Sequence, residues 1–245
     1  MHHDLAQQTA LVTGATAGIG RATAQALAAR GASIIVHGRN EQRAADTLQR
    51  IEALGAKARF EPADLTDPAQ VTALADRAGE VDILVNNAGV FHFARTVDTT
   101  PATFDAHIAV NLRAPYLLVQ ALAPGMTERG HGAIINVSSG AADTPGLGSG
   151  IYGATKAALE SLTRVWAAEY GPAGVRVNAV AAGPTRTEGT AAYGDAFESA
   201  GQAVALQRLA DPEEIAGAIA FMASPDASYV NGATLSAMGG RPALG

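Results

Sequence analysis

Short apolar runs rich in β-branched residues recur along the chain and alternate with longer segments of helical pattern. The runs that predict strands are Ala10–Thr13, Ser33–Val36, Ala58–Glu61, Val81–Val85, Ala133–Val137 and Val175–Val180. Continuous apolar runs of this length are typical of parallel strands that are buried on both faces. Three pairs, Asp67-Pro68, Thr100-Pro101 and Asp211-Pro212, predict helix starts, because a capping side chain precedes proline at the first helical position.

Repeated strand, helix, strand order predicts right-handed crossovers and therefore an α/β fold. We expect a single-domain Rossmann fold over residues 1–245, a doubly wound parallel sheet with helices on both faces. No linker rich in proline, glycine or serine divides the sequence.

Composition and charge narrow the functional classes. Of the 245 residues 48% are hydrophobic, and the formal net charge of −6 argues against nucleic acid or an acidic membrane surface as a partner. The absence of cysteine excludes thiolate catalysis and thiolate metal sites. No apolar run approaches the roughly 20 residues of a membrane span, and the N-terminus lacks a signal-peptide pattern. We therefore expect a cytosolic protein.

A glycine-rich segment follows the first predicted strand directly. It reads Thr13-Gly14-Ala15-Thr16-Ala17-Gly18-Ile19-Gly20 and opens a helix that runs to Arg30. Glycines here let the backbone approach a pyrophosphate, whose charge the helix N-terminus stabilises. The alternative is an ordinary glycine-rich turn, which the position between a strand and a helix disfavours. The segment predicts a dinucleotide site.

The end of the second strand, Val36-His37-Gly38-Arg39, bears on the choice of cofactor. An enzyme that prefers the unphosphorylated cofactor usually carries a carboxylate where Gly38 stands. The planar guanidinium of Arg39 suits the oxygens of a 2′-phosphate. This favours NADP(H) over NAD(H), the alternative being that Arg39 only solvates a loop.

Polar residues also follow the third and fourth strands. Asp64 is either an acceptor for an adenine amine or a local cap. Small and amide-bearing residues at Asn86-Asn87-Ala88-Gly89 would let a flat ring lie close to the backbone, although Asn86 could instead tie adjacent strands together.

Tyr152 and Lys156 stand four residues apart in a helical segment, so the phenol and the ammonium share one face. Tyrosine titrates near ~10 and is a poor base at neutral pH unless a positive charge favours the phenolate. Lys156 supplies such a charge. The chain has only one other lysine, Lys57, against 15 arginines. A lysine at 156 therefore suggests that this position needs a compact ammonium and would not fit a guanidinium. A solvated surface pair is the competing interpretation.

These motifs together resemble the short-chain dehydrogenase/reductase family, in that family's order and over nearly the whole chain. The resemblance implies that Ser139, thirteen positions before Tyr152, is the active-site serine rather than Ser138, and that Asn111 joins a water-linked proton relay through Lys156. It also extends the cofactor site to the loop after the sixth strand. The cofactor half of the domain would span about 1–90 and the catalytic and substrate half about 91–245, with a substrate lid at about 188–206. The cofactor-binding residues so expected are Thr13, Gly14, Thr16, Gly18, Ile19, Gly20, Arg39, Asp64, Leu65, Asn87, Ala88, Gly89, Tyr152, Lys156, Gly183, Pro184, Thr185 and Thr187.

The resemblance implies hydride transfer between the nicotinamide and a small-molecule carbonyl or secondary alcohol, with Tyr152 as acid or base and Ser139 polarising the substrate oxygen. No metal is expected. Two positions depart from the family pattern: Ala182 replaces a proline before Gly183, and Met238 replaces an aspartate before the glycine pair.

The general pattern is similar to bacterial 3-oxoacyl-(acyl-carrier-protein) reductases, and that reaction is one alternative. Those enzymes typically dock their acidic carrier with arginines where this chain has Gly130 and Ala173, although Arg129 and Arg176 lie nearby. Two rivals remain. A catalytically silent NADP-binding regulator is disfavoured by the intact set of catalytic candidates. A sugar-nucleotide epimerase or dehydratase is disfavoured because the chain leaves no room for a substrate domain.

The residues expected to face the substrate give a mostly apolar pocket, which does not favour one ketone or alcohol over another. They are Phe91, His92 and Phe93, residues 141–147, and the lid with Tyr193 and Phe197. The segments 100–123 and 152–170 carry apolar residues on more than one face, so we expect a homotetramer or dimer, the alternative being a monomer with alanine-rich helices.

Overall fold

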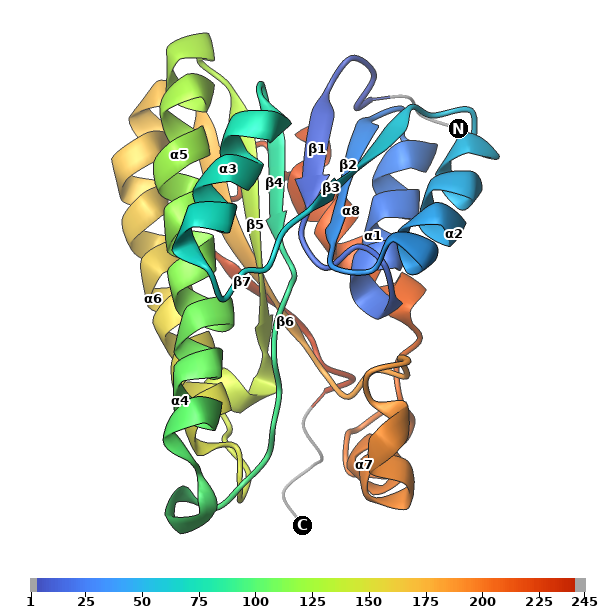
Figure 1. The fold of residues 1–245 in the computed structure, drawn as a ribbon, viewed down its shortest axis with the longest axis vertical. Helices are drawn as coiled ribbons and strands as arrows, with labels where there is room; N and C mark the ends of the chain where they lie inside the picture. Colours follow the sequence, from blue (N-terminus) through green and yellow to red (C-terminus); the bar gives the residue numbers. More distant parts are fainter. Residues whose placement is uncertain (1–3, 241–245) are drawn as a thin grey trace.

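The computed structural model describes residues 4–240, and in this range the chain forms one seven-stranded sheet whose paired strands are all parallel. The strand order is β3-β2-β1-β4-β5-β6-β7 (Figure 1). The strands are β1 (Thr9–Val12), β2 (Ser33–Gly38), β3 (Ala58–Pro62), β4 (Ile83–Asn86), β5 (Gly132–Ser139), β6 (Val175–Ala182) and β7 (Thr234–Ala237).

Helices cover both faces of this sheet (Figure 1). The α-helices are α1 (Gly18–Ala29), α2 (Glu41–Glu52), α3 (Pro68–Ala78), α4 (Pro101–Ile108), α5 (Ala114–Arg129), α6 (Gly150–Tyr170), α7 (Gly194–Gln202) and α8 (Pro212–Ala223). A π-helical segment, Ala109–Arg113, joins α4 to α5, and short 3₁₀ turns lie at Thr96–Asp98, Gly140–Ala142, Gly171–Ala173, Ala191–Tyr193 and Pro225–Ala227.

Two apolar cores form because successive strand residues point to opposite faces. Val12 belongs to the core beneath α1 and α8, whereas its neighbour Leu11 belongs to the core beneath α3, α5 and α6. The central strands are buried on both faces of the sheet, which explains why their sequences are continuous apolar runs. The predicted doubly wound Rossmann-type sheet is confirmed.

The predicted helix starts are also confirmed. The Asp67 carboxylate accepts a hydrogen bond from the Ala69 amide at the start of α3, and the Thr100 hydroxyl accepts one from the Thr103 amide at the start of α4. At α8, the Asp211 amide donates to the Glu214 carboxylate as half of a capping box.

Two elements differ from the sequence-based expectation. The edge strand β7 is short and partly exposed, so it lacks the buried apolar run that marked the other strands. The long helical segment from Thr100 is interrupted by the π-helical turn, which periodicity does not reveal. Within residues 4–240, no helix is both long and apolar enough to cross a membrane; the cytosolic location stays a prediction.

Candidate functional site

The strand order reverses direction between β1 and β4, and the candidate residues gather at the carboxyl ends of the strands around this point. The glycine-rich turn follows β1, Asn87 follows β4, and Ser139 ends β5. Tyr152 and Lys156 come from the first turns of α6, and Asn111 lies in the π-helical segment. Residues scattered over 140 positions of sequence therefore meet at one edge of the sheet.

The Ser139 side chain lies near the Tyr152 hydroxyl and acts to lower the pKa of that phenol. Adjacent Ser138 points to the other side of the strand, where its hydroxyl donates to a Glu160 carboxylate oxygen at 2.6 Å. The alternation of the strand thus separates the two serines and places Ser139 at the tyrosine.

Burial raises the pKa of Tyr152, and the nearby Ser139 side chain only partly offsets this effect. The expectation that the charge of Lys156 would favour the phenolate is not met, because desolvation dominates. At neutral pH the phenol is protonated and is therefore poised as a proton donor.

Lys156 is buried, and its Nζ donates to the Val137 carbonyl oxygen at 2.8 Å. Nζ lies 5.9 Å from the centroid of the Tyr152 ring, so the shared helix face expected from the spacing is present. Burial lowers the pKa of Lys156 to about 8. A Cβ atom at Gly89 would lie 3.5 Å from Nζ, so glycine keeps the ammonium open on this side.

Asn111 is fully buried and clamps the backbone of Val90. Its Nδ2 donates to the Val90 carbonyl at 2.9 Å, and its Oδ1 accepts from the Val90 amide at 2.8 Å. Nδ2 also approaches the Thr155 hydroxyl at 3.2 Å, next to Lys156 in sequence. These bonds orient the segment after Gly89; the water-linked relay stays a prediction.

The glycine-rich turn follows a tight path that depends on its glycines. Gly14 and Gly18 adopt φ of +65° and +50°, which side chains disfavour. A Cβ atom at Gly20 would lie 2.2 Å from the Gly14 carbonyl oxygen, so only glycine fits there. The Asn87 side-chain amide donates to the Thr13 carbonyl at 2.8 Å, and the Thr13 hydroxyl accepts from the Asn87 and Ala88 amides. These bonds hold the turn against the end of β4.

His37 is a buried residue beside the turn whose role the sequence did not reveal. Its Nδ1 accepts from the Gly14 amide at 3.1 Å, and its Nε2 donates to the Ala63 carbonyl at 3.2 Å. Burial lowers the pKa of His37 to about 4, so it is neutral near pH 7. The one available signal was a histidine placed at the end of an otherwise apolar strand.

A Cβ atom at Gly38 would lie 2.5 Å from the Thr16 Cγ2, so a side chain at this position would require Thr16 to move. Arg39 follows and is exposed. Asp64 forms a local turn, in which one carboxylate oxygen accepts from both the amide and the hydroxyl of Thr66 at 2.9 Å. Leu65 is buried beside it.

Asn86 ties adjacent strands together. Its Nδ2 donates to Oδ1 of Asn136, its partner in the register of β4 and β5, at 2.9 Å. The interpretation that it serves the sheet is thus confirmed.

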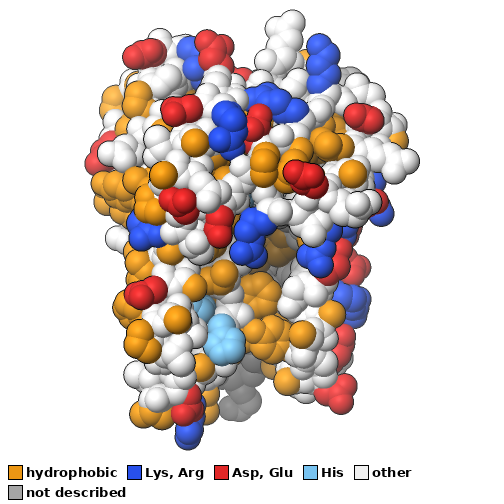
Figure 2. Space-filling model, viewed as in Figure 1, with side chains coloured by type: hydrophobic (Ala, Val, Ile, Leu, Met, Phe, Trp, Pro, Cys, Tyr) orange, Lys and Arg blue, Asp and Glu red, His pale blue; other side chains and the backbone are white. Residues whose placement is uncertain are grey.

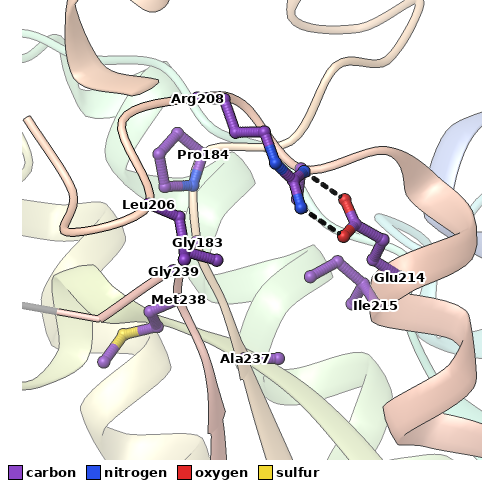
Figure 3. A pocket seen from close by; sticks show the side chains of 10 residues that line it. Gly183, Pro184, Leu206, Arg208, Glu214, Ile215, Ala237, Met238 and Gly239 are labelled. Carbon is purple, nitrogen blue, oxygen red and sulfur yellow. Dashed lines mark hydrogen bonds and ion pairs between the residues drawn. The ribbon is translucent and has the colours of Figure 1, made fainter. Parts of the chain in front are cut away.

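The loop after β6 runs through Gly183, Pro184, Thr185 and Thr187. The Thr185 hydroxyl donates to the Gly183 carbonyl at 2.9 Å, and the Thr187 hydroxyl bonds with that of Thr190 at 3.1 Å. A hollow of about 170 Å³ backs this loop, closed on one side by two Arg208–Glu214 hydrogen bonds of 2.6 and 2.7 Å (Figure 3). The hollow is separate from the tyrosine site, because none of the catalytic candidates Asn111, Ser139, Tyr152 and Lys156 lines it.

Aromatic rings surround the exposed side of Tyr152. Phe93 packs edge-on against Tyr152 and against Tyr193, with centroid distances of 5.7 Å in each case. The Tyr193 hydroxyl donates to the Phe91 carbonyl at 2.8 Å, and its ring lies 6.1 and 6.3 Å from those of Phe91 and Phe197. Figure 2 shows apolar side chains on both sides of the hollow between the α4 and α7 sides of the molecule. The rim of the site is apolar.

A second buried histidine, His107, supports this rim. Its Nε2 accepts from the His92 amide at 3.2 Å and its Nδ1 donates to the Thr103 carbonyl at 2.8 Å. Its ring lies 6.4 Å from that of Tyr152. Sequence reasoning did not single it out.

The sequence of this chain is similar to those of known proteins. Residues 14–241 match the family model described as enoyl-(acyl carrier protein) reductase. Human dehydrogenase/reductase SDR family member 4 is 36% identical over 247 residues, which cover 97% of this chain and 88% of that protein.

Two solved structures extend the comparison. One, a short chain dehydrogenase/reductase family protein, is 50% identical with a TM-score of 0.90 and covers 97% of this chain and 98% of that one. The other, a 3-oxoacyl (acyl-carrier-protein) reductase from Agrobacterium tumefaciens with NADP bound, is 33% identical with a TM-score of 0.93 and covers 97% of this chain and 95% of that one. This chain belongs to the short-chain dehydrogenase/reductase family of oxidoreductases.

Proposed function

We propose that this protein is an NADP(H)-dependent reductase of small-molecule ketones or aldehydes, working reversibly on the corresponding alcohols, with Tyr152 as the acid/base. The observation that carries this proposal is the buried Tyr152 phenol, which lies near Ser139 and has the Lys156 ammonium 5.9 Å from its ring centroid. The bound NADP(H) would supply the hydride. The protein contributes orientation and proton transfer.

Each catalytic candidate has a role that its surroundings support. Tyr152, protonated because burial raises its pKa, would donate its proton to the carbonyl oxygen in the reductive direction. Ser139 would donate a second hydrogen bond to that oxygen. Lys156 would grip a ribose hydroxyl from its position beside Gly89, and Asn111 would hold the Gly89–Val90 backbone in place.

The cofactor site is proposed on the cradle formed by Gly14, Gly18 and Gly20 and on Arg39. Three features fit NADP(H): glycine geometry that admits phosphates, a glycine in place of a carboxylate at 38, and an exposed guanidinium at Arg39. The remaining candidates expected from the sequence would complete this site.

Reduction of a 3-oxoacyl group on a carrier protein is the second candidate, favoured by the likeness to the Agrobacterium enzyme. The two arginines that would dock the carrier are engaged elsewhere. Arg129 donates to the Val81 carbonyl at 2.7 Å, and Arg176 donates to the carbonyls of Met222 and Ser224 at 2.8 and 3.1 Å. Guanidiniums that cap backbone carbonyls are poorly available to an acidic partner, so we favour free small-molecule substrates.

We also propose that the protein is a homotetramer or dimer. Tyr116 and Val165 are 48% and 46% exposed on the outer face of α5 and α6, beside an apolar hollow of about 630 Å³. An exposed apolar helix face of this kind suits a second copy of the chain. Light scattering coupled to gel filtration would test this assembly.

The decisive experiment measures NADPH and NADH oxidation against ketones, aldehydes and 3-oxoacyl thioesters, with Tyr152→Phe as the control. We expect turnover with NADPH that falls at least about a thousandfold in Tyr152→Phe, while NADPH binding is retained. Tight cofactor binding by the wild-type protein without turnover of any carbonyl would instead support a regulatory role.

A further inference from the structure

A carboxylate from the distant lid segment occupies the start of α1. The Gly18 amide, the first of the helix, donates to Glu188 Oε2 at 3.0 Å, and Arg21 forms an ion pair with Glu188 Oε1. The first amides of a helix have no partner within the helix and attract anions. Glu188 therefore uses a donor that belongs to the proposed pyrophosphate site.

The contact is close and is part of an ordered segment. A Cβ atom at Gly18 would lie 3.0 Å from both the Cβ and the Cγ2 of Thr187, so the segment lies directly on the turn. The hydroxyl of Thr190 donates to the Thr185 carbonyl at 3.0 Å, and Gly189 faces the Phe91 ring. The segment that bears Glu188 is thus the joint between the glycine-rich turn and the aromatic lid.

We propose that Glu188 is an internal competitor for the dinucleotide: without cofactor its carboxylate holds the base of the lid on the glycine-rich turn, and the pyrophosphate displaces it. This inference rests on the proposed function. Two anions cannot share the same amide donor, and like charges a few ångströms apart repel each other. Binding of the dinucleotide would therefore free the Glu188 carboxylate from the turn, and Glu188 would set both cofactor affinity and the coupling of the cofactor site to the lid.

The surroundings of Glu188 allow its contact with the glycine-rich turn to open. The Glu188 side chain is 49% exposed, so its carboxylate can move into solvent without a large desolvation change. Arg21 also pairs with Asp46 at 3.2 Å and keeps a partner after Glu188 leaves. The ion pair at the turn can open without leaving a buried charge alone.

The first test is NADPH affinity in Glu188→Gln, measured by titration of the fluorescence of bound NADPH. Removal of the charge should tighten binding about fivefold to tenfold at low salt, and the gain should shrink as ionic strength rises. The matched control is Glu198→Gln, which neutralises an exposed carboxylate on the same lid, 3.7 Å from Arg186, and should leave affinity unchanged.

The second test uses the cofactor-free protein and does not involve activity. In Glu188→Ala, hydrogen exchange of the Gly18 amide and of residues 187–203 should be faster than in the wild-type protein, whereas Glu198→Ala should not change exchange at Gly18. Unchanged or weaker NADPH affinity in Glu188→Gln, or unchanged exchange in Glu188→Ala, overturns this inference alone. A wild-type protein that binds no nicotinamide dinucleotide overturns the proposed function and this inference with it.

Discussion

The imidazole of His37, on β2, accepts a 3.1 Å hydrogen bond from the backbone amide of Gly14, on the glycine-rich turn. The acceptor is Nδ1, while Nε2 donates to the Ala63 carbonyl after β3. One neutral ring therefore joins three strand ends at the proposed adenosine side of the site. Protonation of Nδ1 would remove the acceptor and place a charge in a buried position.

Acid should destabilise the protein through His37. Burial lowers its pKa in the folded state to about 4, below the ordinary 6.5, so the unfolded chain binds more protons between these values. The neutral His37 ring therefore contributes about 3 kcal/mol to the free energy of unfolding. This contribution is complete above about pH 6.5 and is lost as the pH falls to 4. We expect His37→Asn to reduce the difference in free energy of unfolding between pH 7 and pH 5, measured with urea. The exposed His92→Asn should retain the wild-type difference; equal pH dependence in all three proteins would contradict the assignment.

The buried Lys156 ammonium should support catalysis but lower the free energy of unfolding. Its pKa of about 8 in the folded state lies below the ordinary value of 10.5, so the charged form is disfavoured by burial at neutral pH. Wild-type stability should rise as pH increases from about 8 to 10.5. Lys156→Met should abolish turnover and weaken NADPH binding. It should nevertheless raise the free energy of unfolding at pH 7 by about 1–2 kcal/mol, because the removal of a buried charge outweighs the loss of the hydrogen bond to the Val137 carbonyl. Calorimetry at pH 7 checks this, and a lower Tm in the variant would refute it.

Arg39 should decide the preference between cofactors. If its guanidinium binds the 2′-phosphate, Arg39→Ala should lower the ratio of kcat/KM for NADPH over NADH by at least about tenfold, chiefly through KM for NADPH. Arg164→Ala, which removes an exposed guanidinium from α6, serves as the control. A ratio that stays constant in Arg39→Ala would show that this arginine only solvates its loop.

A buried amide chain beneath the site should be important for stability. Asn86 donates to Asn136 at 2.9 Å, and Asn136 donates to the Thr163 hydroxyl at 2.8 Å, linking β4, β5 and α6. Asn136→Ala leaves buried polar groups unpaired and should cost about 2–3 kcal/mol of unfolding free energy. The double variant with Asn86→Ala should lose less than the sum of the single variants, because the two residues share one bond. Strict additivity in urea denaturation would argue against that coupling.

Local pattern in the sequence determined much of this protein. The buried strands, the capped helix starts, the glycine-rich turn and the Tyr152–Lys156 spacing each lie within a few consecutive residues. A period of two or of 3.6 and the steric limits on glycine act over that range, so they can be read without the fold. The resemblance to the family added Ser139 and Asn111, and the structure places Ser139 near the Tyr152 phenol and Asn111 against the Thr155 hydroxyl.

Tertiary structure alone decided the contacts between segments far apart in the chain. Glu188 meets Gly18 across 170 positions, and His37 meets Gly14 between two strands, because the crossovers bring these ends together. The π-helical turn at Asn111 and the edge strand β7 also depend on their neighbours. Even the pKa of Tyr152 followed burial rather than the nearby lysine. Periodicity specifies which face of an element is apolar, but packing decides what that face meets and how far its charges lie from water.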